Sequence, residues 1–242
     1  MSPVASFAIP SRFCGPPKYG NGGFTSGLLA AALCDHRSAV DDIGVEATIR
    51  KPIPLDKALY VVTQGSGVVL MDGEELVMEA ARTAISSDLP HTVSVAEATE
   101  AAEGSPAFTN HPFPTCFVCG PERLNGDGLR IFPGRLREAE IFAAPWLPAD
   151  EFADENGNVK PEIVWAALDC PTGFAGGFPD EGTLVTGRLG VSMSAPVKAG
   201  QPHVLVSWRT GGEGRKVFAS AALLDARGGL CAQARATWIR LR

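Results

Sequence analysis

The sequence predicts an α+β protein in which one unit, a buried helix followed by antiparallel strands, occurs twice in a single chain. Three observations lead to this prediction: strand-like segments fill the last third of the chain, the same series occurs in the first half, and a strongly apolar helix candidate precedes each series. A helix that is apolar on nearly every face is normally buried. A helix followed by a block of antiparallel strands is typical of α+β folds.

The clearest strand region lies in the last third of the chain. Its segments are rich in Val, Ala, Leu and Thr, and breaks rich in Gly, Pro and Asp separate them, which is a strand signature. The segments cover residues 185–200, 203–210, 216–228 and 230–241. Val204, Val206 and Trp208 alternate with other residues and so fall on one face of a strand. We therefore expect an antiparallel meander with one buried face.

The first half carries the same series of segments. Residues 45–58 match residues 190–202, and residues 68–85 match residues 222–239. Between these blocks the second half has nine extra residues, which fit a longer hairpin in a glycine-rich stretch. The chain is therefore expected to contain an internal structural repeat.

Each strand series follows a helix candidate, over residues 21–33 in the first half and residues 160–170 in the second. Pro161 suits the first turn of a helix, and Glu162 is favourable near the positive N-terminal end of the helix dipole. Pro171 lacks a backbone N–H and is expected to end the second helix.

The segment between the two series is less regular. Residues 94–108 predict a polar linker or a short surface helix. We place the boundary near residue 100, which gives an N-terminal repeat over residues 1–100 and a C-terminal repeat over residues 101–242. The second repeat then opens with strands near residues 129–133 and 139–144.

Composition excludes several classes of function. The formal net charge is −6 and no basic stripe is present, so we expect no nucleic-acid partner. No apolar run approaches the ~20 residues that a membrane helix needs, so no membrane association is expected. The first residues lack the basic and apolar regions of a signal peptide, which predicts a cytoplasmic protein.

The cysteines do not predict a metal site. Cys116 and Cys119 form a CxxC motif, but a second CxxC or a histidine pair is missing, and only His111 lies nearby in sequence. A plain turn through Cys119, Gly120 and Pro121 is the expected structure. We expect neither a metal nor another cofactor.

The order of these segments resembles the hotdog thioesterase superfamily. The residues that carry the resemblance are the second helix, the sequence SAPVKAG, the long strands and the sequence LDARGGLCAQARATW. The chain is most similar to the phenylacetyl-CoA-type acyl-CoA thioesterases and, more distantly, to the tandem thioesterases of the thioesterase II kind. The resemblance covers both halves. It implies a double hotdog fold, in which two long central helices are wrapped by antiparallel strands of one continuous sheet.

The resemblance also implies a set of catalytic positions in the second half. In that family His-Gly-Gly begins the central helix, an acid follows seven positions after the second Gly, and a hydroxyl lies ten residues before the Pro of SAP. Asp169 matches the acid and Thr186 matches the hydroxyl. Lys160, Pro161 and Glu162 stand where the family has His-Gly-Gly, and Pro161 has no N–H to donate.

The first half departs from the family pattern in the opposite way. Asn21, Gly22 and Gly23 match His-Gly-Gly, with Asn in place of His. Ala30 stands at the position of the acid, and Asp42 stands at the position of the hydroxyl. The two half-sites therefore complement each other, and the resemblance implies one complete site shared between the repeats and one inactive site.

The chemistry of thioester hydrolysis suits this composite site. The unpaired N–H groups of Gly22 and Gly23 at a helix N-terminus, beside Asn21, would polarise the thioester carbonyl. Asp169 would activate water as a general base or attack the carbonyl itself, and Thr186 would assist. The implied substrate is an acyl-CoA.

Two other functions remain open at this stage. The missing His and the sequence Pro161-Glu162 are compatible with a non-catalytic acyl-CoA or lipid-binding protein on the same fold. A dehydratase or hydratase is the third reading, for which His111 followed by Pro-Phe-Pro is a weak signal some fifty residues before the second helix. Association into a homo-oligomer is compatible with each reading.

Overall fold

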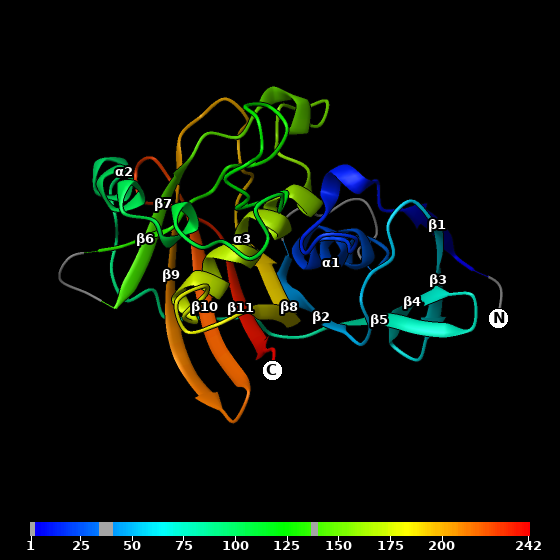
Figure 1. Cartoon of the computed structure of the whole chain (residues 1–242). Coiled ribbons are helices and arrows are strands. Elements are labelled where there is room, and N and C mark those ends of the chain that lie inside the picture. Colours follow the sequence, from blue (N-terminus) through cyan, green and yellow to red (C-terminus); the bar gives the residue numbers. More distant parts are fainter. Residues whose placement is uncertain (1–2, 34–40, 137–139) are drawn as a thin grey trace.

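The computed structural model describes residues 3–33, 41–136 and 140–242, and this part of the chain contains an eleven-stranded antiparallel sheet (Figure 1). The strand order is β1-β3-β4-β5-β2-β8-β11-β10-β9-β7-β6. The strands are β1 (Ala5–Ala8), β2 (Asp41–Ile49), β3 (Ala58–Gln64), β4 (Gly67–Asp72), β5 (Glu75–Arg82), β6 (Gly134–Arg135), β7 (Ile141–Trp146), β8 (Leu184–Met193), β9 (His203–Glu213), β10 (Lys216–Asp225) and β11 (Leu230–Arg240).

The sheet has the same strand order on either side of its centre. The central pair is β2 and β8, which run antiparallel with Ala47 opposite Leu189. Outward from β2 follow β5, β4, β3 and β1, and outward from β8 follow β11, β10, β9 and β7. Each strand of the first half therefore has a counterpart at the corresponding position of the second half. The predicted large antiparallel sheet is confirmed.

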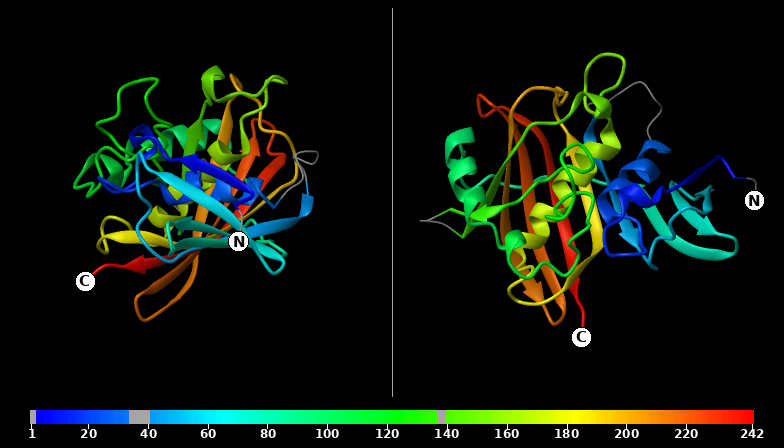
Figure 2. Two further views of the ribbon diagram at one scale, coloured as in Figure 1. Left: turned by 90° about the vertical axis from the view of Figure 1, so that its right-hand side faces the viewer. Right: turned by 45° about the horizontal axis from the view of Figure 1, so that its top comes forward.

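Two helices, α1 (Gly22–Ala31) and α3 (Pro161–Ala175), lie side by side against one face of the sheet (Figure 2). The prediction of two long central helices is not confirmed, because α1 has only ten residues, whereas α3 has fifteen. None of the helices within the described ranges has the length and hydropathy needed to cross a membrane.

A third helix, α2 (Val95–Glu103), corrects the prediction that the C-terminal meander has one buried face. Its start is fixed by a capping box between Ser94 and Glu97. Ala98 of α2 packs with Val204 of β9 in one cluster of buried side chains, whereas Leu205, the next residue, belongs to the larger core on the helix α3 side. Successive strand residues face opposite sides. The first half of β9 is therefore buried on both faces.

The predicted end of the second helix at Pro171 is wrong. Helix α3 continues through Pro171 to Ala175. A proline inside a helix removes one backbone hydrogen bond. Every residue from Ile163 to Ala175 is buried, however, so packing outweighs the loss of that bond. Asp169 consequently lies inside the helix and not at its end.

The predicted strand near residues 129–133 is also wrong. The described segment forms no strand there, because its backbone pairs with the loop that carries the CxxC motif: Leu129 N–H donates to Phe117 O at 2.8 Å, and Ile131 N–H donates to Val118 O at 2.9 Å. The next predicted strand, over residues 139–144, corresponds to β7, although its first residue lies outside the described residues.

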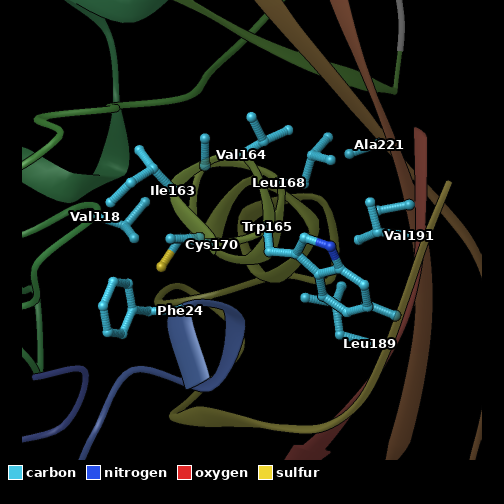
Figure 3. Close-up of a cluster of buried hydrophobic side chains, with 14 of the residues drawn as sticks. Phe24, Val118, Ile163, Val164, Trp165, Leu168, Cys170, Leu189, Val191 and Ala221 are labelled. Atoms are coloured by element: carbon cyan, nitrogen blue, oxygen red, sulfur yellow. The ribbon is translucent and has the colours of Figure 1, made fainter. Parts of the chain in front are cut away.

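Helices α1 and α3 approach each other so closely that only glycine fits at two positions of α1. A Cβ atom at Gly23 would lie 2.5 Å from Asp169 Cβ, and a Cβ atom at Gly27 would lie 2.5 Å from Glu162 Cα. Figure 3 shows the surroundings of α3, with Trp165 directed toward the strand that carries Leu189. At these two positions the backbone of α1 therefore lies directly against α3, with no side chain of α1 between the two helices.

The contact at Gly27 predicts a loss of stability in Gly27→Ala. An alanine in a helix normally stabilises by about 0.5–1 kcal/mol over glycine. Here the added methyl group meets the backbone of α3, so we expect a net destabilisation of about 1–3 kcal/mol. Urea unfolding followed by circular dichroism measures this change.

Gly104→Ala is the matched control for that prediction. Gly104 ends α2 with an ordinary negative φ, and a Cβ atom there would meet nothing closer than Ala101 O at 3.8 Å. Its unfolding midpoint is expected to stay near that of the parent chain. A Gly27→Ala midpoint equal to that of Gly104→Ala would contradict the close helix contact.

Candidate active site

A pocket of about 420 Å³ opens at the N-terminal end of α1, and both halves of the chain line it. The first half contributes Tyr19 and Ile49, among others, and the second half contributes Phe178, Trp238 and Ile239. The walls are mostly apolar, and a few polar groups converge on them. This combination is typical of a binding site for a small, largely apolar ligand.

Asp169 is the carboxylate of this pocket, and it is held by residues from both halves of the chain. Its side chain is buried, with 1% of the residue exposed. Asp169 Oδ2 accepts a hydrogen bond from the Gly23 N–H at 2.8 Å, and Oδ1 accepts one from Thr186 Oγ1 at 2.9 Å. The structure therefore brings together three site residues that were predicted from the sequence. They are Gly23 on α1, Asp169 on α3 and Thr186 on β8.

The environment of Asp169 raises the pKa of its carboxyl group above the value that an aspartate has in water. Burial raises the pKa of Asp169 to about 7, while the hydrogen bonds from Thr186 and Gly23 act in the opposite direction by stabilising the carboxylate. Negative charge on the nearby Cys116 raises the pKa of Asp169 further. A carboxyl group in this range can both accept and release a proton near neutral pH.

Asn21 begins α1 as its N-cap residue. Its side-chain Oδ1 accepts a hydrogen bond from the Phe24 N–H at 2.9 Å. This bond satisfies one of the amides that a helix N-terminus leaves without a partner. Asn21 is also buried and lines the pocket, so the residue that caps α1 also forms part of the pocket wall.

Gly22 and Gly23 have different surroundings, although the sequence assigned them the same role. The Gly23 N–H already donates to Asp169. Among the described residues no group accepts a hydrogen bond from the Gly22 N–H, and Gly22 lines the pocket. A Cβ atom at Gly22 would lie 3.0 Å from Thr186 Cβ, so the helix start sits directly against β8. Gly22 is therefore the amide that remains for a ligand, and Gly23 positions the acid.

The corresponding end of α3 lacks both groups. Pro161 begins α3 and has no N–H. Ala30, at the position that matches the acid, is a buried alanine on α1. The side chain of Asp42, at the position that matches the hydroxyl, lies outside the described residues. Among the residues that the structure describes, only one of the two pseudo-symmetric positions thus combines a carboxylate with a free helix amide.

A second layer of hydrogen bonds fixes the backbone at Asp169, and no pattern in the sequence predicts it. Thr172 Oγ1 donates to Asp169 O at 2.6 Å, and Trp238 Nε1 of β11 donates to Thr172 Oγ1 at 2.8 Å. All three residues are buried. This chain of bonds ties α3 to β11 at the level of the pocket.

Three cysteines gather beside the pocket, and the sequence predicted only two of them as neighbours. The thiols of Cys116, Cys119 and Cys170 lie within 4.8 Å of one another, and all three residues are buried. Cys170 follows Asp169 directly in α3. The signal that could have identified it is this adjacency of a third cysteine to the predicted acid. The expected turn after the CxxC motif is present, with Gly120 N–H donating to Cys116 O at 2.9 Å.

His111, which the sequence placed far from the second helix, also lies in this region. Its ring packs against Phe174 of α3, with centroids 6.2 Å apart, and its Nε2 is 3.2 Å from Cys119 Sγ. Burial lowers the pKa of His111 below its ordinary value. The loop that precedes β6 therefore brings His111 next to α3, although some fifty residues separate the two in sequence.

Replacement of the N-cap residue tests how the start of α1 is held. In Asn21→Ala the Phe24 N–H loses its acceptor, so we expect a loss of about 0.5–2 kcal/mol of unfolding free energy. Asn21→Ser keeps an N-cap oxygen and is expected to retain most of the stability. Urea unfolding of both variants measures the difference. Equal midpoints for the two variants would contradict a capping role of Asn21.

Comparisons with known proteins address the fold. No protein-family model and no curated protein matches the sequence. A protein of unknown function with a hot dog fold from Alicyclobacillus acidocaldarius is 12% identical, with a TM-score of 0.62 over 98% of this chain and 92% of that chain. A tesB protein from Mycobacterium avium subs paratuberculosis is 12% identical, with a TM-score of 0.63 over 94% of this chain and 90% of that chain.

A third solved structure gives the same picture. A protein provisionally named a thioesterase, from Novosphingobium aromaticivorans, is 12% identical, with a TM-score of 0.64 over 98% of this chain and 95% of that chain. At this level of identity a likeness identifies the fold and not the activity. The chain has the hotdog fold.

Proposed function

We propose that this protein hydrolyses an acyl thioester at a single composite site formed by the two halves of the chain. One observation carries the proposal: the carboxylate of Asp169 is hydrogen-bonded to the N-terminus of α1, next to the unused Gly22 N–H and at the wall of an apolar pocket. A base and a carbonyl-polarising amide thus lie side by side where an acyl group can enter.

The Gly22 N–H is suited to bind the thioester carbonyl oxygen. Negative charge develops on this oxygen when the carbonyl carbon is attacked, and a preorganised backbone N–H stabilises that charge. The positive end of the helix dipole adds to the effect. Loss of one such donor typically costs about 10²–10³ in rate.

Asp169 is suited to the attacking step by either of two routes. As a general base it removes a proton from a water molecule, whose oxygen attacks the carbonyl carbon while the thiolate leaves. As a nucleophile its carboxylate attacks the carbon itself, the C–S bond breaks and the thiolate leaves, and water then hydrolyses the resulting anhydride. In both routes Thr186 and the Gly23 N–H hold the carboxylate in place.

An acyl-CoA is the substrate that we propose. The apolar pocket fits an acyl group, and two of the similar folds carry names that refer to thioesterase or tesB proteins. Arg50 and Lys51 line the same pocket, and they form ion pairs with Glu79 and Glu75. Contact with the phosphates of coenzyme A would require these cations to exchange their carboxylate partners.

Substitution of the acid tests the mechanism. Asp169→Asn keeps the size of the side chain and one oxygen for the Gly23 N–H, so the fold is expected to persist. The amide can neither remove a proton from water nor attack, so we expect kcat to fall by at least about 10². Release of the thiol from a panel of short, medium, long and aromatic acyl-CoAs, followed with a thiol reagent, measures the change.

The same panel of acyl-CoAs, used in a binding measurement beside the thiol-release assay, distinguishes an enzyme from a protein that only binds acyl-CoA. If the parent chain binds acyl-CoAs but releases no thiol from any of them, the protein is a non-catalytic acyl-CoA-binding protein and the proposal fails. If turnover is the same in Asp169→Asn and in the parent chain, hydrolysis takes place elsewhere. A crotonyl thioester in the panel, followed for hydration, tests the dehydratase or hydratase reading.

Thr186 gives a second, graded test. Thr186→Val removes the hydroxyl that donates to Asp169 Oδ1 and keeps the shape of the side chain, whereas Thr186→Ser keeps the hydroxyl. A hydrogen bond to a charged group contributes about 1.5–3 kcal/mol, so kcat in Thr186→Val is expected to fall about 10–100-fold. Thr186→Ser should stay within a few-fold of the parent chain. The assignment fails if both variants lose the same activity.

A further inference from the structure

The cluster of three thiols is unusual because two separate segments of the chain supply it. Cys116 and Cys119 lie in the loop before β6, and Cys170 lies in the interior of α3. Cys116 Sγ is 3.8 Å from Cys170 Sγ. All three residues are buried, with at most 7% exposed. Neither the packing of α3 nor the proposed hydrolysis requires sulfur at these positions.

The separation of the sulfur atoms corresponds to that of ligands around one metal ion. In a tetrahedral site with zinc–sulfur bonds of about 2.3 Å, two sulfur atoms lie about 3.8 Å apart. The observed Cys116–Cys170 separation has this value, and all three sulfur atoms lie within 4.8 Å of one another. The atoms could therefore surround a zinc ion with little movement.

The CxxC loop holds its two cysteines close together through a tight turn. The Gly120 N–H donates to Cys116 O at 2.9 Å. A Cβ atom at Gly120 would lie 2.5 Å from the same oxygen, so only glycine fits at this point of the turn. A pair of cysteines from one such CxxC turn is a common source of two zinc ligands.

We propose that Cys116, Cys119 and Cys170 bind a zinc ion. Thiolates are soft ligands that favour zinc among the common divalent ions. A pairwise disulfide would use two of the three sulfur atoms and leave the third without a function, whereas a single zinc ion uses all of them. The ion would join the CxxC loop to α3 at the residue after Asp169.

His111 supports the charge of this site as a hydrogen-bond donor. His111 Nδ1 accepts a hydrogen bond from the Phe113 N–H at 3.0 Å. In a neutral ring the proton is then on Nε2, which is 3.2 Å from Cys119 Sγ and donates to it. The protein thus supplies three sulfur ligands, and a water molecule would complete the tetrahedral coordination of the zinc ion.

Metal content is the first test, and it does not depend on any catalytic activity. The full chain, purified under reducing conditions without added metal, should contain about one zinc ion per chain when measured by inductively coupled plasma mass spectrometry. Cys170→Ser should lose most of this zinc. Cys231→Ser is the matched control, because Cys231 is a buried cysteine on β11 outside the cluster, and it should retain the metal.

Cobalt(II) provides a second measurement that does not rely on a variant. Replacement of zinc by cobalt in the parent chain should give the visible absorption of a tetrahedral site and a near-ultraviolet sulfur-to-cobalt band. Zinc added back should remove both. A metal-free parent chain that gains neither zinc nor these bands, and whose cluster thiols react freely with a thiol reagent after unfolding, would overturn the proposal. Equal zinc content in Cys170→Ser and Cys231→Ser would also overturn it.

Discussion

The arrangement of this protein depends on the contact between α1 and α3, where two glycines bring the backbone of α1 directly against α3. Gly23 and Gly27 lie one turn apart and present a flat surface to α3. A larger residue at either position would move the helices apart by the thickness of a methyl group. The hydrogen bond of 2.8 Å between the Gly23 N–H and Asp169 would then be lost. The composite site is thus a direct result of close helix packing.

Because of the same contact, each half of the chain supplies a different part of the candidate site. The first half provides a helix N-terminus with a free amide at Gly22, and the second half provides the carboxylate. At the pseudo-symmetric position Pro161 and Ala30 provide neither group. A fused chain allows each half to lose one part of the site, because the other half is always present at the required distance.

The sequence predicted the parts of the structure that depend on local pattern. The strand series of the last third and its counterpart in the first half follow from residue spacing, and the structure contains both. Through its resemblance to the hotdog thioesterases, the sequence also predicted that Thr186 assists Asp169, and a hydrogen bond joins the two side chains. It did not predict that Gly23 would bind the acid, or that Cys170 would join the CxxC loop, because both depend on contacts between distant segments. The burial of β9 by α2 was missed for the same reason, since alternation describes one face at a time.

Pro171 shows how tertiary contacts can override a local rule. The turn of α3 that contains it is held from four directions: Asp169 binds α1 and β8, Cys170 faces the CxxC loop, and Thr172 accepts a hydrogen bond from β11. Thr172 Oγ1 also returns a hydrogen bond to Asp169 O within the same turn. Each contact requires helical geometry at this point, and together they outweigh the one backbone bond that proline removes. The turn that carries the acid is therefore tightly constrained, which is what a preorganised carboxylate needs.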